Sequence, residues 1–109
     1  MGHTLPRSRK TWFDAIIADH VARIASGLED AEAFDSRVLA RHVIEAVKRT
    51  GISLRKTKDG LLACPYCGRA PFTKKGYYLH LLRSHYQEMI DSVGHEIERL
   101  ASASKDVEL

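Results

Sequence analysis

Apolar residues recur at intervals of three and four along the first half of the chain. In the first such segment, residues 11–26, the apolar face consists of Phe13, Ile16, Ile17, Val21 and Ile24. This spacing is typical of one face of an α-helix. Thr11 followed by Asp14 has the spacing of a capping box, so the helix is expected to begin there. Gly27 favours the left-handed conformation that ends a helix, so a stop near Ser26 is expected.

A second helical pattern lies between Asp35 and Gly51. Its apolar face consists of Leu39, Ala40, Val43, Ile44 and Val47. Either Asp35 or Ser36 can cap its N-terminus, because both residue types accept backbone hydrogen bonds there. Gly51 is expected to end it. Residues 11–51 are therefore predicted to form an N-terminal helical region.

The periodicity changes from helical to alternating after Gly51. Ile52 and Leu54 alternate with polar residues, which predicts a strand. Asp59-Gly60 is a strong signal for a tight hairpin turn, and the segment 61–64 is expected to return as the second strand.

A longer helical pattern begins near Lys74 and is predicted to run to about Ala103. Its second part carries a narrow apolar seam made of Tyr86, Ile90, Val93, Ile97 and Leu100. Two heptads are too few to define a coiled coil. The seam therefore packs either on the two N-terminal helices or on a second copy of the chain, as a homodimer.

The two cysteines of the chain fall in one motif, Cys64-x2-Cys67-x12-His80-x4-His85. This is a zinc-ligand spacing, and two thiolates with two imidazoles suit tetrahedral Zn²⁺. The protein supplies all four ligands, so no position remains for water or substrate. One structural zinc ion is therefore predicted, and not a catalytic one.

The interval between the two histidines predicts a break in the last helix. Five residues turn an ideal helix by about 140° beyond a full turn, so one ion cannot be reached comfortably from both positions. The helix is expected to change its pitch between Leu82 and His85 and to resume near Tyr86.

Residues 62–85 resemble a C2H2-type zinc finger, and the Cys-Pro-Tyr-Cys-Gly-Arg knuckle also resembles small single-finger proteins of archaea and their viruses. The resemblance implies a ββα fold. Two positions depart from the family pattern. Pro71 occupies the position at which the family usually has an aromatic residue, and Phe72 follows one residue later. Tyr77 occupies the position at which the family usually has a leucine. Phe72 and Tyr77 still offer an apolar plug beneath the metal.

The expected fold class is thus mostly α with a small ββα zinc finger. Four parts are expected: a basic arm (1–10), the N-terminal helical region (11–51), the hairpin and finger (52–85) and a C-terminal helix and tail (86–109). Among 109 residues, 44% are hydrophobic and 28% charged, which is typical of a soluble globular protein. No apolar run approaches the ~18–20 residues of a membrane span.

The first ten residues have no apolar core, so they do not predict a signal peptide, and an intracellular protein is expected. Its place would be the cytoplasm or nucleoid in a prokaryote or virus and the nucleus in a eukaryote. The sequence offers no open metal position, nucleophile–base pair or glycine-rich phosphate loop, so an enzyme is not expected.

Basic charge is concentrated around the metal motif. Residues 51–86 contain seven Lys or Arg and one acid, Asp59, whereas residues 87–109 contain two basic and six acidic residues. A basic patch of this kind attracts polyanions. The sequence therefore predicts a nucleic-acid-binding protein, DNA rather than RNA, with a role as a small transcriptional regulator.

The resemblance implies that bases would be read from Thr73, Gly76 and Leu79, and only the first of these can form a hydrogen bond through its side chain. Arg69, Lys74, Lys75 and Arg83 suit phosphates, so contacts mainly to the backbone are expected.

Two alternatives remain open at this point. The apolar finger helix (Tyr77 to Leu82) is also typical of a protein-interaction module. Basic charge beside Tyr77 and Tyr78 would equally suit RNA or a ribonucleoprotein, where bases stack on aromatic rings.

Overall fold

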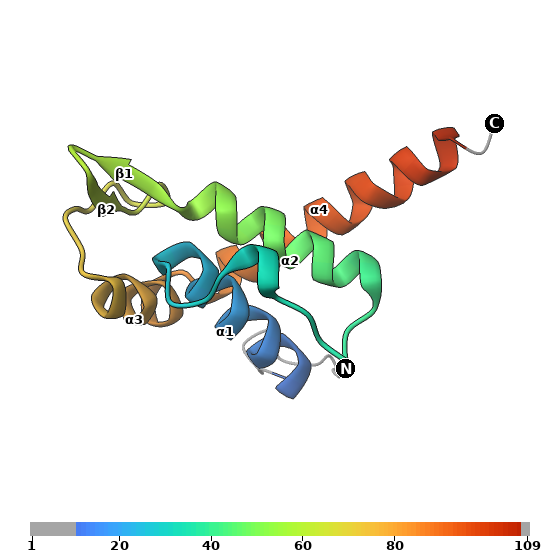
Figure 1. Ribbon diagram of the computed structural model, residues 1–109, viewed down its shortest axis with the longest axis horizontal. Helices are drawn as coiled ribbons and strands as arrows, with labels where there is room; N and C mark the ends of the chain where they lie inside the picture. Colours follow the sequence, from blue (N-terminus) through green and yellow to red (C-terminus); the bar gives the residue numbers. More distant parts are fainter. Residues whose placement is uncertain (1–10, 108–109) are drawn as a thin grey trace, which may run out of the picture.

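The computed structural model of the chain describes residues 11–107. Within this range the protein is mostly helical, with an antiparallel hairpin between the second and third long helices (Figure 1). The predicted fold class is confirmed, while the basic arm predicted at 1–10 lies outside the described residues. In chain order the elements are α1 (Trp12–Ser26), the short 3₁₀ helix η1 (Ala31–Ala33), α2 (Arg41–Leu54), β1 (Lys56–Lys58), β2 (Leu61–Ala63), α3 (Lys74–Ser84) and α4 (Tyr86–Val107).

Helix α1 begins and ends where its sequence predicts. The Asp14 N–H donates to the Thr11 hydroxyl at 3.0 Å, which satisfies one of the free donors of the first turn. Gly27 follows the last helical residue with φ of 87°, a left-handed conformation that costs glycine little.

Helix α2 begins later than predicted, at Arg41, and neither Asp35 nor Ser36 caps it. The Ser36 N–H donates to the Asp35 carboxylate at 2.8 Å, and the Val38 N–H donates to the Ser36 hydroxyl at 3.1 Å. Short polar side chains close local turns as readily as they cap helices. Here they shape the loop that precedes the helix.

Helix α2 also ends later than predicted, because Gly51 lies inside it and the helix continues to Leu54. The strand expected at Ile52–Leu54 is therefore wrong. Gly51 packs so closely against α1 that a Cβ atom built on it would lie 2.6 Å from Ile24 Cγ2. Glycine at this position permits the two helices to approach, and it does not stop the second one.

The hairpin is confirmed at its predicted turn. Asp59 and Gly60 have φ of 56° and 81°, and Lys58 pairs with Leu61 across them. Positive φ at both central residues matches the right-handed twist of the two strands. The side chains of Lys56 and Lys58 lie on the same face of β1 by strand alternation, and both are exposed.

The apolar seam of α4 packs inside the chain, against α2 and α1. Val93 is buried and Ile97 is half-buried, while Met89, which the seam did not include, is fully buried. Beyond these residues α4 extends past the other helices (Figure 1). Among residues 11–107, no helix combines the length and the apolar character needed to cross a membrane.

One hydrophobic core joins the other helices to the ββα unit, which consists of β1, β2 and α3. Tyr77 and Leu81 of α3 are fully buried, and they belong to the same cluster as Ile24 of α1, Val47 of α2 and Met89 of α4. The ββα unit is therefore not a separate globule attached by a linker.

Candidate metal centre

Cys64 and Cys67 are brought together by a tight turn after β2. The Cys64 N–H donates to the Arg69 carbonyl at 2.9 Å, and the Gly68 N–H donates to the Cys64 carbonyl at 2.7 Å. Gly68 has φ of 80°, a conformation that residues with a side chain rarely adopt. This backbone arrangement directs both thiols toward the same point.

His80 reaches that point from α3, and His85 reaches it from the helix break that follows α3. Helix α3 ends at Ser84, and His85 has φ of −133° and ψ of 28°, outside the helical region. Helix α4 begins at Tyr86. The break predicted from the five-residue interval is thus confirmed, and it brings the second imidazole round to the side of the first.

The four side chains form a cluster that could hold a metal ion. Their donor atoms all lie within 4.8 Å of one another, and Cys67 Sγ is 3.3 Å from His80 Nε2. A tetrahedral zinc shell would separate such atoms by about 3.3 to 3.8 Å, so little movement is needed to close it. His85 Nε2 is buried and has no hydrogen-bond partner among the described residues. A metal ion bound to this nitrogen would supply the missing partner, so the four side chains suit a metal ion.

The two thiols differ in their environments. Burial raises the pKa of Cys64. The exposed Cys67 has its pKa lowered, first by a hydrogen bond from the backbone of Arg69 and then by the nearby His85 side chain. Because metals bind the thiolate, Cys67 is the thiol more readily available as a ligand.

Aromatic rings enclose the cluster on two sides. Phe72 stacks on His80 with ring centroids 4.7 Å apart, and on Tyr77 at 5.4 Å. Tyr66, which lies between the cysteines in sequence, has its ring centroid 5.0 Å from that of His85. The plug expected from Phe72 and Tyr77 is therefore in place.

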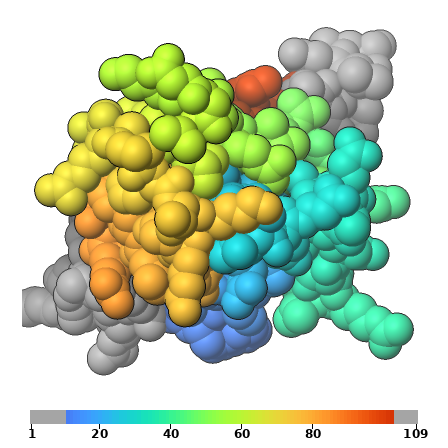
Figure 2. Space-filling view, turned by 60° about the vertical axis from the view of Figure 1, so that its left-hand side comes forward, coloured from blue at the N-terminus to red at the C-terminus, as the bar shows by residue number. Residues whose placement is uncertain are grey.

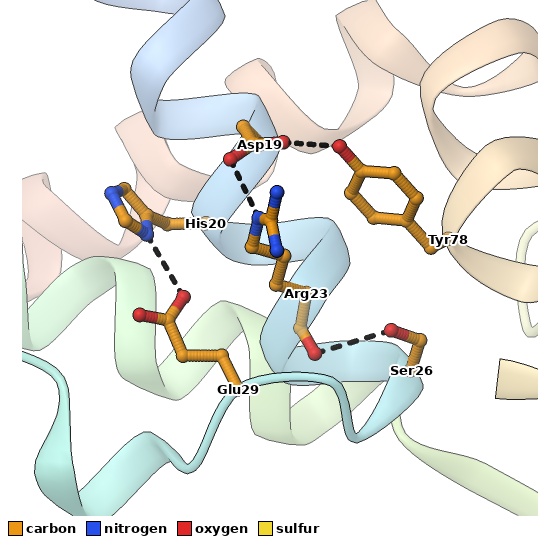
Figure 3. Close-up of polar contacts among 6 residues, drawn as sticks. All are labelled: Asp19, His20, Arg23, Ser26, Glu29 and Tyr78. Carbon is orange, nitrogen blue, oxygen red and sulfur yellow. Dashed lines mark hydrogen bonds and ion pairs between the residues drawn. The ribbon is translucent and has the colours of Figure 1, made fainter. Parts of the chain in front are cut away.

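Helix α3 is fixed to α1 by a polar contact that Figure 3 shows. The Tyr78 hydroxyl donates to the Asp19 carboxylate, which also accepts from Arg23 Nε at 2.8 Å. The Arg23 guanidinium in turn lies 5.3 Å from the centre of the Tyr78 ring. One face of α3 is thus occupied by the helical half of the chain.

Arg55 and Tyr77 also complete the C-terminal ends of α1 and α2. Arg55 Nε and Nη2 donate to the carbonyl of Ile24, at 3.0 and 2.5 Å. The buried Tyr77 hydroxyl donates to the carbonyl of Leu54 at 2.5 Å. These carbonyls belong to the last turns of α1 and α2, where helical carbonyls lose their i+4 partners, and that of Ile24 also accepts from the Gly27 N–H at 3.2 Å.

The residues predicted to contact nucleic acid are exposed, and the segments that carry them, the cysteine turn and α3, lie beside the hairpin on one face of the molecule (Figure 2). Arg69, Lys75 and Arg83 are exposed. Thr73 is exposed as well, but its hydroxyl caps α3 by accepting from the Gly76 N–H at 3.0 Å. Lys74 is exposed too, and a Cβ atom built on Gly27 would lie 3.5 Å from its Cε. Its positive charge therefore lies near the C-terminal end of α1, where the helix dipole is negative and favours a cation.

The sequence did not indicate that Glu88 and Tyr66 lie beside the cluster. The Glu88 carboxylate lies 2.5 Å from His85 Nδ1, and the Tyr66 hydroxyl lies 2.9 Å from Ser92 Oγ. Glu88 follows His85 by three residues, a spacing that places side chains together on a helix. That spacing could have indicated the contact between Glu88 and His85, whereas no local pattern indicated the contact between Tyr66 and Ser92.

The fold and the cluster define a helical protein with an inserted ββα unit whose Cys₂His₂ residues could hold a metal ion. No family model, curated protein or solved structure matches the chain.

Proposed function

We propose that the ββα unit is a zinc finger of the C2H2 type, and that its zinc ion is structural. Two thiolates and two imidazoles form the donor set that tetrahedral Zn²⁺ prefers. With four protein ligands from Cys64, Cys67, His80 and His85, no coordination position is left for a substrate. The ion would supply folding energy and no chemistry.

We propose further that this finger region binds nucleic acid through phosphates. The observation that carries the proposal is the surface charge of residues 51–86. All seven basic side chains of this segment are exposed, and Asp59 is its only acid. Such a surface neutralises phosphates and releases counterions, which gives affinity without sequence information.

The positions that would read bases are poorly equipped to do so. The Thr73 hydroxyl is used to cap α3, Gly76 has no side chain, and Leu79 is half-buried. By contrast, Lys75 and Arg83 are exposed, two helical turns apart on α3. These features favour contacts to the sugar-phosphate backbone over a base code.

Duplex DNA is the partner that the aromatic residues of α3 favour. Stacking of single-stranded bases would need free rings, but Tyr77 is fully buried and Tyr78 is half-buried against α1. The same burial argues against a protein partner on the apolar face of α3, because Tyr77 and Leu81 already pack in the core of this chain.

A salt titration of DNA binding by the zinc-loaded chain tests this proposal. If four to six phosphates are neutralised, log K falls against log salt with a slope of about −3.5 to −5.5. Lys75→Ala should make the slope shallower by about 0.9 and weaken binding to unrelated sequences equally. Arg41→Ala is the matched control, because Arg41 is exposed at the opposite end of α2 from the hairpin (Figure 1).

A slope near zero would contradict the proposal and favour an apolar partner. Loss of discrimination at a single base pair in Lys75→Ala would show that this lysine reads a base.

A further inference from the structure

The first turn of α4 places a carboxylate directly on a ligand of the metal cluster. Glu88 Oε1 lies 2.5 Å from Nδ1 of His85, three residues earlier in the chain. The His85 side chain is 10% exposed and that of Glu88 is 51% exposed. The carboxylate therefore approaches a nearly buried imidazole from the solvent side.

The two nitrogens of His85 have different surroundings. Nδ1 faces Glu88, whereas Nε2 is buried without a hydrogen-bond partner among the described residues. A neutral imidazole has one nitrogen that donates and one that accepts, and an ionised carboxylate can only accept. With the proton on Nδ1, the lone pair is on Nε2, on the side of Cys67 and His80.

The position of Glu88 is itself fixed from the cysteine turn. The Tyr66 hydroxyl donates to the backbone carbonyl of Glu88 at 3.3 Å and lies 2.9 Å from Ser92 Oγ. Tyr66 stands between the two cysteines, so the turn that carries the thiols also holds the start of α4. The carboxylate is thereby held at a defined distance from the cluster.

We propose that Glu88 is a positioning residue for the metal centre, which holds His85 in the tautomer and orientation that present Nε2 to the ion. The inference rests on the zinc finger proposed above. Carboxylates that hold a metal-binding histidine in this way commonly change metal affinity by about 10- to 100-fold. An ordinary surface pair at this spacing would change helix stability slightly and leave metal affinity unaltered.

The experiment compares zinc affinity in full-length variants by competition with a chromophoric chelator. We expect Glu88→Ala to bind zinc about 10- to 100-fold more weakly than the original chain, and Glu88→Gln, which keeps a neutral acceptor, to fall between them. Glu98→Gln is the matched control, because Glu98 is an exposed acid on the same helix. Urea unfolding of the zinc-free proteins, measured in parallel, separates metal affinity from helix stability.

Nitrogen-15 spectra of the histidine side chains give a second readout that a merely structural role would not move. In the zinc-loaded original chain we expect the metal on His85 Nε2 and a protected proton on Nδ1. In Glu88→Ala that proton should exchange faster with water.

Three results would overturn the inference. The first is zinc affinity of Glu88→Ala within twofold of the original chain, and the second is zinc bound through Nδ1. The third is an affinity loss accounted for entirely by weaker folding of the zinc-free protein. A chain that binds no zinc at all would overturn the proposed finger as well, whereas normal zinc binding by the variants would remove only the role of Glu88.

Discussion

Asp19 illustrates how a single carboxylate can join two parts of this chain. It lies on α1 and accepts from Arg23 of the same helix and from Tyr78 of α3 (Figure 3). Burial alone would raise the pKa of Asp19, but the hydrogen bonds from Tyr78 and Arg23 outweigh it and lower the pKa. The native fold therefore favours the ionised carboxylate.

A lowered pKa in the folded state means that Asp19 contributes stability above its unfolded pKa, about 3.9, and loses it as the pH falls through the folded value. We predict that Asp19→Asn lowers the free energy of unfolding by about 0.5–1 kcal/mol at neutral pH, because the pair is partly screened by solvent. The difference from the original chain should shrink as the pH falls below the unfolded pKa of about 3.9, as measured by urea unfolding at several pH values.

Glu45→Gln provides the control for this prediction. Glu45 pairs with Arg49 on the surface of α2 at 3.2 Å and contacts no other element through that pair. Its loss should change stability only slightly. An equal effect of the two substitutions at all pH values would contradict the role given to Asp19.

At the scale of elements, two glycines inside helices have opposite surroundings. A Cβ atom on Gly51 would meet Ile24 of α1 at 2.6 Å, whereas a Cβ atom on Gly94 of α4 would have nothing within 4 Å. Helix propensity alone favours alanine at both positions by roughly 0.5–1 kcal/mol. At Gly51 the steric conflict is the larger effect, because Ile24 is fully buried and cannot move aside.

We predict that Gly51→Ala lowers the free energy of unfolding by about 1–3 kcal/mol, the usual cost of an overpacked core. Gly94→Ala should raise it by about 0.5–1 kcal/mol, so each substitution is the control for the other. Thermal unfolding of both variants measures the difference. A stabilised Gly51→Ala would show that α1 and α2 can separate freely.

The elements that were predictable depend on local signals. The cysteine and histidine spacing, the Asp59-Gly60 turn and the break at His85 all follow from residues close together in the chain. The end of α2 could not be predicted from local signals, because the conformation of Gly51 is decided by its contact with Ile24 on another helix. The contact between Asp19 and Tyr78 spans 59 residues and likewise has no local signal.

At the scale of the whole molecule, the metal cluster and the helices share one core. Cys64, Tyr77 and Leu81 belong to the same buried cluster as Ile24 and Val47. Energy supplied by the proposed zinc ion would therefore stabilise α1 and α2 as well as the ββα unit. Binding at 1,000 times the dissociation constant contributes about 4 kcal/mol to the folded state.

We predict that a strong chelator lowers the hydrogen-exchange protection of core amides in α1 and α2 together with those in α3. The buried residues Ile24 and Val47 are suitable reporters. Cys64→Ser, measured without chelator, should reproduce the effect because it removes one ligand. Unchanged protection in α1 and α2 after complete zinc removal would show that the two parts fold independently.

The hydrogen bonds from Arg55 and Tyr77 to the ends of α1 and α2 also bear on how this protein can change during evolution. Zinc fingers that fold alone can be duplicated, lost or exchanged between proteins, because their neighbours do not depend on them. Here, removal of the ββα unit would take the Tyr77 hydroxyl from the Leu54 carbonyl and would expose the buried residues that pack with Tyr77 and Leu81. We therefore expect the ββα unit and the helices to be inherited together, because substitutions on one side of the shared core restrict those on the other.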